Sequence, residues 1–154
     1  MDIIKIDHSE SSLVIDLFNK YRIFYKQPSN MELCRKFITD RLKNNESVIF
    51  VATTKENEKI VPTGFTQLYP KFSSGKAIKI WVLNDLYVDE NYRNRGIGEN
   101  LIHRVLTFVK DDNANHVELS TATDNYHAQR LYETIGFEKQ VPNADFLSYK
   151  INLT

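Results

Sequence analysis

Hydrophobic and polar residues follow one another along this chain with two distinct periods. Runs in which apolar residues are continuous, or alternate with polar ones, predict strands, whereas apolar residues spaced by three and four positions predict helices. Strand patterns occupy residues 2–7, 47–53, 60–69 and 77–88. Because tight polar turns join consecutive strands, we expect these strands to be antiparallel. Pro62 and Gly64 indicate an edge or a bulge near the start of the third strand.

Helical spacing is found in four segments, each with one apolar face and with a capping signal at its start. The expected helices cover residues 13–24, 31–42, 97–109 and 128–135. Their N-terminal signals are Ser9 or Ser12, the capping box Ser29-Asn30-Met31-Glu32, Gly96, and Asp124. Gly136 stands where a left-handed C-cap glycine is expected at the end of the last helix.

Three further strand signals complete the pattern. Residues 117–121 alternate as a strand, and Phe137 and residues 146–153 predict two closing strands. The element order is then β-α-α-β-β-β-α-β-α-β-β, which is typical of a mixed α/β or α+β domain. No repeat, low-complexity tract or linker divides the chain, so we expect residues 1–154 to form a single domain.

The composition narrows the class of protein without identifying a function. The 154 residues are 42% hydrophobic and 12% aromatic, which excludes disorder as the main state. The 20 basic and 20 acidic side chains give a formal net charge of zero, which argues against a dedicated nucleic-acid binder. The single cysteine forms no internal disulfide, and neither a membrane-spanning run nor a signal-peptide pattern is found. We therefore expect a cytoplasmic protein.

The segment from Asn84 to Gly98 has the clearest chemical character. A strong strand runs through a loop with two arginines and two glycines directly into an amphipathic helix. The first amides of a helix lack intrahelical acceptors, and the helix dipole places partial positive charge at the same end. Gly96 and Gly98 allow close backbone approach, and Arg93 and Arg95 add formal charge. The pattern predicts an anion site for which a diphosphate is the natural ligand.

Two other interpretations of this loop are open at this point. One is an ordinary turn and helix cap whose arginines are merely solvated. The other is a dinucleotide-binding fingerprint, but Leu101 replaces the third glycine of that pattern. That fingerprint requires a loop that opens a βαβ unit at the N-terminus, whereas this loop follows hairpin-like strands.

The arrangement Arg93-x-x-Gly96-x-Gly98, placed after a strand and at the start of a helix, resembles the acetyl-CoA loop of the GNAT N-acetyltransferase superfamily. A second motif downstream resembles the family's asparagine-led helix and reads Asp124-Asn125-x-x-Ala128-x-x-Leu131-Tyr132-x-x-x-Gly136-Phe137. The element order is also that of the family, so the resemblance covers nearly the whole chain. Within the superfamily, the run Asn84-Asp85-Leu86-Tyr87-Val88 is similar to the Hpa-type histone and polyamine acetyltransferases and to spermidine/spermine acetyltransferases.

The resemblance implies a central, splayed, mostly antiparallel mixed sheet of about seven strands flanked by about four helices. It also implies a bulge in the strand that ends at Val88, where main-chain groups of Leu86, Tyr87 and Val88 bind the pantetheine arm of acetyl-CoA. Pyrophosphate binding is assigned to the loop and helix start, which comprise Arg93, Asn94, Arg95, Gly96, Ile97, Gly98 and Glu99. Asn125 would reach the pantetheine from the other side of the splay. Family members are commonly homodimers, so a homodimer is expected.

Tyr132 matches the tyrosine that family members place beside the cofactor as a general acid. Acetyl transfer releases CoA as a thiolate, and a phenol near the sulfur can protonate it because a free thiol has a pKa of about 8.5. Periodicity alone favours a core position instead, since Tyr132 lies on one apolar stripe with Ala128, Leu131 and Ile135. The Leu-Tyr-x-x-x-Gly-Phe context favours the catalytic interpretation.

An amine must lose a proton before it attacks, so a base is also required. The polyamine enzymes usually place a glutamate just before the aspartate of this strand, and this chain has Asn84 there. Asp85 is a candidate base, directly or through water, and is equally a candidate for a buried hydrogen-bond acceptor that holds the bulge. Loss of the proton to solvent is the third alternative.

We expect the acceptor amine to bind where the first two helices meet the sheet. Residues 21–27 are rich in aromatic side chains, and aromatic faces attract ammonium groups. The expected acceptor contacts are Tyr25, Gln27 and Asn84. Further candidates for the same wall are Phe65, Gln67, Tyr69 and Trp81, although ordinary core positions explain Phe65 and Trp81.

Together, these residues predict an N-acetyltransferase that moves acetyl from acetyl-CoA to a primary amine by direct attack in a ternary complex. A small molecule such as a polyamine or a lysine-like amine is the favoured acceptor, with a protein amine as another. The alternative is an acetyl-CoA-binding regulatory or partner-binding domain without catalysis, for which Asn84 is the only support. No histidine, cysteine or carboxylate spacing indicates a metal site, and no nucleic acid or membrane partner is expected.

Overall fold

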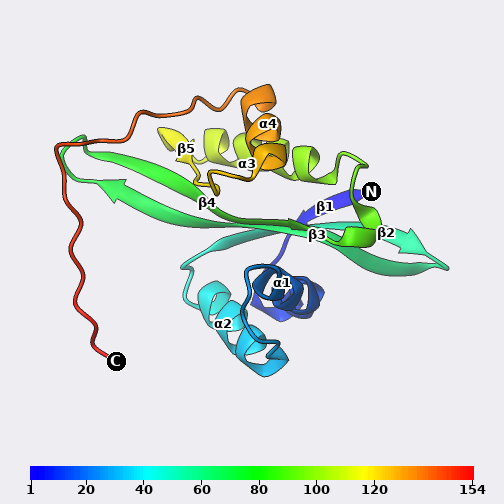
Figure 1. The fold of residues 1–154 in the computed structure, drawn as a ribbon. Coiled ribbons are helices and arrows are strands. Elements are labelled where there is room, and N and C mark those ends of the chain that lie inside the picture. The colour runs from blue at the N-terminus through cyan, green and yellow to red at the C-terminus, as the bar shows by residue number, and fades with distance from the viewer. The chain divides into compact units, whose positions relative to one another are not determined.

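A computed structural model describes residues 1–154, which group into two units, Met1–Ser120 and Thr121–Thr154 (Figure 1). The elements of the first unit are β1 (Asp2–Lys5), α1 (Ser12–Phe24), α2 (Met31–Lys43), β2 (Val48–Glu56), β3 (Lys59–Ser73), β4 (Ile78–Val88), α3 (Ile97–Asp111) and β5 (His116–Glu118). Two short 3-10 helices, His8–Glu10 and Glu90–Tyr92, precede α1 and α3. The second unit contains α4 (Tyr126–Ile135).

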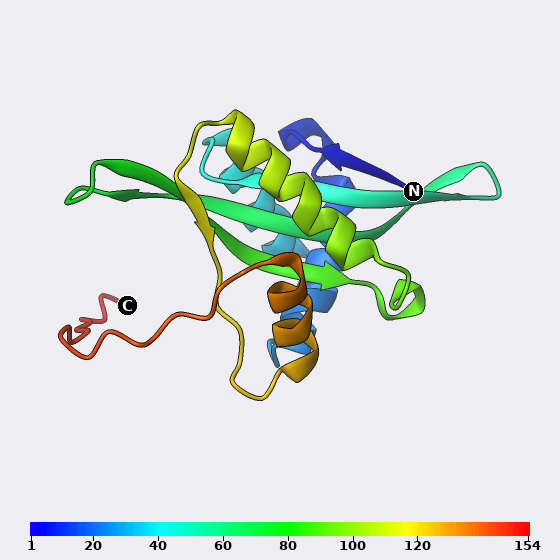
Figure 2. The ribbon, with the colours of Figure 1, turned by 90° about the horizontal axis from the view of Figure 1, so that it is seen from above.

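The first unit is a five-stranded sheet with helices on both faces. Its strands lie in the order β1-β2-β3-β4-β5, and neighbouring strands are antiparallel except β4 and β5, which are parallel. Helices α1 and α2 cover one face of the sheet, and α3 crosses the other (Figures 1 and 2). The predicted class, a mixed α+β fold, is confirmed, and the predicted element order holds through α4.

Apolar stripes hold the helices to the sheet. Five apolar residues of α3 are buried, namely Ile97, Leu101, Ile102, Val105 and Val109. On the opposite face, Val14, Ile15, Leu17 and Phe18 of α1 pack in one cluster with Cys34 and Ile38 of α2 and with Phe65 of β3. Burying one such side chain contributes about 1.5–3 kcal/mol, so these stripes fix where the ends of α1 and α3 lie against the sheet.

Two bulges interrupt the sheet. Ala52 pairs with Gly64 and Thr53 with Pro62, so Thr63 is an extra residue in β3, close to where the sequence indicated a bulge. Gln67 pairs with Asp85 and Leu68 with Leu83, so Asn84 is the extra residue in β4. A bulge of this kind re-aims the side chains beside it, which here are Asn84 and Asp85.

The helix caps differ in detail from those expected. Asp7, and neither Ser9 nor Ser12, provides a capping box, and it caps the 3-10 turn before α1. Asn125, and not Asp124, caps α4, because its side-chain oxygen accepts a hydrogen bond from the Ala128 N–H at 3.2 Å. Asn30 caps α2 within the predicted box, and Gly136 ends α4 with a φ of 122°, as expected.

The two closing strands are not present, so the sheet has five strands and not about seven. Residues 146–153 alternate between apolar and polar side chains, which is the pattern that predicted a strand. A strand also requires a hydrogen-bonded neighbour, and nothing pairs with this segment. Its apolar side chains are exposed, including Tyr149 at 90% and Leu153 at 89%.

No helix of the structure is both long and apolar enough to cross a membrane.

Candidate active site

The loop between β4 and α3 has the backbone geometry of an anion site. Gly96 occupies the N-cap of α3 in the left-handed conformation, with φ of 77° and ψ of 10°, and Asn94 also has a positive φ of 63°. No side chain caps this helix, and the backbone N–H groups of residues 93–99 make no hydrogen bonds within the protein. A row of free N–H groups at the positive end of a 15-residue helix suits a phosphate group.

The two arginines of this loop are held by backbone carbonyls. Arg93 donates from Nε to the Val88 carbonyl at 2.9 Å, and its guanidinium lies 5.5 Å from the centre of the Tyr87 ring. Arg95 donates from Nη2 to the Asn91 carbonyl at 3.3 Å. Both side chains are exposed and neither forms an ion pair with a carboxylate. Both positive charges therefore lie at the loop, and no carboxylate of the protein neutralises them.

The loop is also tied to α1 through a buried carboxylate. Asp89, which is 6% exposed, accepts a hydrogen bond from the Asn91 N–H at 3.0 Å and pairs with Lys20 at 2.7 Å. Burial acts to raise the pKa of Asp89, but the hydrogen bonds from Lys20 and Asn91 outweigh burial, so the pKa is lowered. The pair fixes the start of the loop against α1.

Beside this loop, β4 has an edge with no strand partner. β5 pairs only with Ile80, Trp81 and Val82, so the two parallel strands separate after that point. From Leu83 to Val88, the backbone groups of β4 that point away from β3 face no neighbouring strand. Such groups can bind an extended, amide-containing chain in the manner of an added strand. Leu86, Tyr87 and Val88, which we expected to bind pantetheine, lie on this edge.

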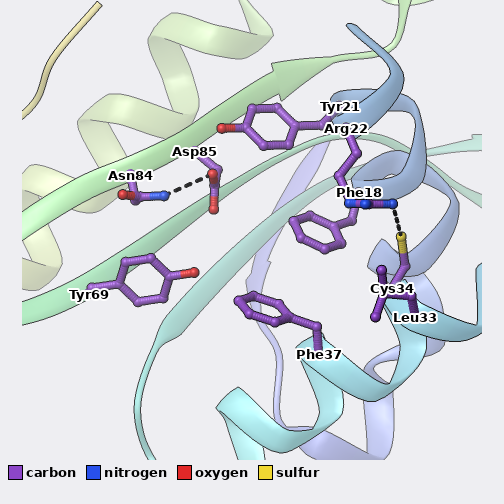
Figure 3. A pocket seen from close by; sticks show the side chains of 9 residues that line it. All are labelled: Phe18, Tyr21, Arg22, Leu33, Cys34, Phe37, Tyr69, Asn84 and Asp85. Carbon is purple, nitrogen blue, oxygen red and sulfur yellow. Dashed lines mark hydrogen bonds between the residues drawn. The ribbon is translucent and has the colours of Figure 1, made fainter. Parts of the chain in front are cut away.

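On the face covered by α1 and α2, the structure has a cavity of about 280 Å³ (Figure 3). Its lining residues come from both helices and from β3 and β4, and they are Phe18, Tyr21, Arg22, Leu33, Cys34, Phe37, Tyr69, Asn84 and Asp85. Asn84 and Asp85 reach it because the bulge in β4 turns both toward this face.

Asp85 is a buried carboxylate, only 3% exposed, that has no cationic partner. It accepts hydrogen bonds from the Gln67 amide at 2.6 Å and from the Asn84 amide at 3.0 Å. Gln67 is itself completely buried, and its Oε1 has no hydrogen-bond partner. Neutral amides support a carboxylate but do not pair with its charge, so Asp85 is available to a cation that enters this end of the cavity.

Two phenols stand near this carboxylate. Burial, together with the hydrogen bond to Asp85, raises the pKa of Tyr21 well above its ordinary value. Burial and the Asp85 charge raise the pKa of Tyr69 to about 12. Both phenols therefore stay protonated at neutral pH, where they offer aromatic faces and hydroxyl groups but do not act as bases.

Aromatic rings form much of the rest of the wall. The Phe18 ring stacks against Tyr21 and Phe37, with ring centres 6.1 and 5.8 Å apart. Aromatic faces next to a carboxylate favour a cation, because the ring quadrupole and the formal charge both attract it. The cavity therefore has the chemistry of a binding site for an organic ammonium group.

The structure brings together only part of the predicted acceptor site. Asn84 and Asp85 line the cavity, but Tyr25 and Gln27 do not. Tyr25 is 54% exposed and packs its ring on Tyr21 at 4.9 Å, and Gln27 donates its backbone N–H to the Arg22 carbonyl at 2.9 Å. The roles predicted for Tyr25 and Gln27 stay predictions.

Two of the candidate wall residues lie in the core. Phe65 is completely buried, and Trp81 points to the α3 side of the sheet, where it donates to Asp112 at 2.8 Å and contacts the Phe108 ring. Five further residues line the cavity without having been predicted as contacts, namely Phe18, Arg22, Leu33, Cys34 and Phe37. A signal for Arg22 existed, because it lies four positions after Phe18 and so shares its helix face.

The second unit carries the two remaining predicted residues. The Asn125 side chain caps α4, and the Tyr132 carbonyl accepts the N–H groups of Gly136 and Phe137 at 3.1 and 3.0 Å. The Tyr132 ring lies edge-on to Phe137, with centres 5.9 Å apart. Within this unit, the Tyr-x-x-x-Gly-Phe motif thus forms the C-terminal end of α4, where the backbone after the helix bonds to the tyrosine carbonyl.

Comparison with known proteins agrees with this geometry. Residues 13–137 match the model of the acetyltransferase (GNAT) family. YhfO, an uncharacterised N-acetyltransferase of Bacillus subtilis, is 37% identical over 153 residues, which cover 99% of this chain and 98% of YhfO. The crystal structure of a probable acetyltransferase is 36% identical, with a TM-score of 0.85 over 100% of this chain and 99% of its own.

A more distant structure shares the fold at 17% identity, with a TM-score of 0.72 over 97% of this chain and 95% of its own. It is a predicted acetyltransferase from Clostridium acetobutylicum solved with acetyl-CoA. The present chain belongs to the GNAT acetyltransferase family and is an acetyltransferase. The finer resemblance to the Hpa-type and polyamine branch stays a prediction.

Proposed function

We propose that the protein transfers the acetyl group of acetyl-CoA to a primary amine by direct attack in a ternary complex. The free N–H groups of residues 93–99 support pyrophosphate binding, with Arg93 and Arg95 adding charge. The unpaired edge of β4 supports binding of the pantetheine arm through the main chain of Leu86, Tyr87 and Val88. Asn125 is the proposed contact of this arm from the second unit.

The acceptor side of the proposal rests on one observation, which is the buried carboxylate of Asp85 without a cationic partner in an aromatic cavity. A protonated amine at this end of the cavity would pair with the carboxylate. The amine must then lose a proton before it attacks, and Asp85, directly or through a water molecule, is the nearest candidate to receive it. Asn84 holds the Asp85 carboxylate through its amide and accepts no proton itself.

In the transfer step, the amine nitrogen forms a bond to the thioester carbonyl carbon, and the carbon–sulfur bond then breaks. The CoA sulfur leaves with the electron pair, and we assign its protonation to the Tyr132 hydroxyl. The attacking nitrogen gives up its second proton to solvent, and the Tyr132 phenolate regains a proton from solvent, so one proton is released overall. This role fits a phenol because it remains protonated at neutral pH and can donate to a thiolate. We further propose a homodimer and a cytoplasmic location, as the family resemblance and the single cysteine lead us to expect.

Thiol release from acetyl-CoA, measured with a panel of primary amines, tests the proposed function. Tyr132→Phe should lower kcat by about 10²–10⁴-fold while leaving acetyl-CoA binding intact, because general-acid catalysis contributes about that much. Retained turnover in Tyr132→Phe contradicts the acid assignment. Saturable acetyl-CoA binding without transfer to any amine or protein favours the alternative, a regulatory or partner-binding domain.

A further inference from the structure

The cavity that contains Asp85 also contains a cationic residue that the proposed chemistry leaves unused. Arg22 lines it from α1, one helical turn after Phe18. Its Nη1 atom donates to the Pro28 carbonyl at 3.2 Å and lies 3.9 Å from the Cys34 sulfur. Neither partner is a carboxylate, and Arg22 forms no ion pair. The remaining N–H groups of its guanidinium are available to a ligand.

The two charges are separated within the cavity. Asp85 projects from β4, whereas the guanidinium of Arg22 lies beside α2, on the other side of the Phe18 ring (Figure 3). The Phe18 ring stands between them, and Leu33 and Phe37 add further apolar lining (Figure 3). One end of the cavity therefore attracts an ammonium group, the other end attracts a carboxylate, and the middle suits a hydrocarbon chain.

We propose, on the basis of the acetyl-transfer function above, that the acceptor is an amine that carries a carboxylate at its far end, with Arg22 binding that carboxylate and Asp85 the ammonium group. Arginine suits this role because its planar guanidinium matches a carboxylate with two parallel hydrogen bonds. A diamine or polyamine is disfavoured, because its second ammonium group would lie against Arg22. An α-amino acid without a side-chain amine is also disfavoured, since its two charges are adjacent and cannot reach both ends.

Three matched probes test this assignment, namely 6-aminohexanoate, 6-aminohexanamide and 1,6-diaminohexane. They share a six-carbon chain and one primary amine but carry a carboxylate, a neutral amide or a second ammonium group at the other end. We expect kcat/KM for 6-aminohexanoate to exceed that of the other two by at least tenfold. Equal rates for the three probes, or a preference for the diamine, would overturn the inference while leaving the acetyltransferase function standing.

Two arginine variants assign the effect to Arg22. Arg22→Gln should lose at least tenfold in kcat/KM for 6-aminohexanoate and much less for the amide, so that the preference collapses. Arg35→Gln is the matched control, because Arg35 is an exposed arginine of α2 that does not line the cavity. It should keep the full preference. An equal loss for all three probes in Arg22→Gln would show that Arg22 only holds the turn at Pro28.

Binding must be measured separately from turnover. Calorimetric titration of 6-aminohexanoate and 6-aminohexanamide into the CoA-saturated protein reports the preference even if no acetyl is transferred. Tighter binding of the carboxylate probe, lost in Arg22→Gln, would support the inference even where the thiol assay fails. Absence of any carboxylate preference in both assays would refute it.

Discussion

At the scale of single residues, Asp85 shows stability and binding acting in opposite directions. A carboxylate that is 3% exposed and supported only by neutral groups, the amides of Gln67 and Asn84 and the Tyr21 phenol, is costly to bury, and nearby Gln67 keeps an unpartnered oxygen. A protein selected for stability alone would not retain this arrangement. A cationic ligand offsets the cost of burying this carboxylate. The unliganded protein therefore favours the binding of an ammonium group beside Asp85.

Asp85→Asn should therefore weaken acceptor binding without weakening the fold. We expect KM for a cationic amine to rise at least tenfold, because the formal charge that attracts the ammonium group is lost. The melting temperature should stay the same or rise, since the new amide can donate to Gln67 Oε1. Steady-state kinetics and thermal unfolding measure the two quantities.

Asp111→Asn is a suitable control for Asp85→Asn, because it removes an exposed carboxylate at the end of α3, away from the cavity. It should leave KM for the amine unchanged. An unchanged KM in Asp85→Asn would instead assign Asp85 the alternative role of holding the bulge.

At the scale of elements, sequence patterns predicted those features that depend on local physics. Gly96 at the start of α3 was expected from spacing, and it occupies a left-handed N-cap that favours glycine. The β4 bulge followed from the family resemblance, and the structure places it at Asn84. The cavity wall was predicted less well, because which face of α1 meets the sheet depends on tertiary packing. Tyr25 and Arg22 are close in sequence, yet only Arg22 lines the cavity.

The pair between Lys20 of α1 and Asp89, which starts the loop before α3, should make stability depend on pH. The pKa of Asp89 is lowered in the folded protein, so the pair stabilises fully above the ordinary carboxyl pKa of 3.8 and is lost as pH falls through the lowered value. Lys20→Met should therefore lower the free energy of unfolding by about 1–2 kcal/mol at pH 7. The loss is kept modest because Lys20 itself is half-exposed. Urea unfolding at pH 7 and at pH 2–3 should show this difference shrinking in acid.

Lys36→Met is the matched control for Lys20→Met. Lys36 pairs with Asp40 at 2.6 Å, a distance as short as that of the Lys20 pair, but both partners are exposed on α2. Solvent screens such a pair, so Lys36→Met should lower the free energy of unfolding by less than Lys20→Met does. Equal losses in the two variants would show that burial of Asp89 does not strengthen its pair, and a loss that does not change with pH would contradict the role of its carboxylate.

At the scale of the whole molecule, strand signals near the C-terminus were the least reliable part of the sequence prediction. Helices close their hydrogen bonds locally, so α4 forms at the predicted place with its own caps. A strand depends on a distant partner, and apolar alternation in residues 146–153 says nothing about where that partner is. The same alternation nevertheless places Leu147, Tyr149, Ile151 and Leu153 at every second position, and all four side chains are exposed.

These exposed side chains lead to the prediction that the protein pairs with a second copy of itself through residues 146–153. An unpaired segment with alternating apolar side chains can form a strand with another chain. Its four large apolar side chains would then lie on one face, and their burial would stabilise the pair. Light scattering of the 18.0 kDa chain should give twice that mass, and Ile151→Asp should shift it to the monomer. Asn152→Asp adds the same charge on the opposite, polar face of the segment and should leave the dimer intact. A wild-type monomer would contradict the prediction, and dissociation by both variants would indicate general repulsion and not the loss of an apolar face.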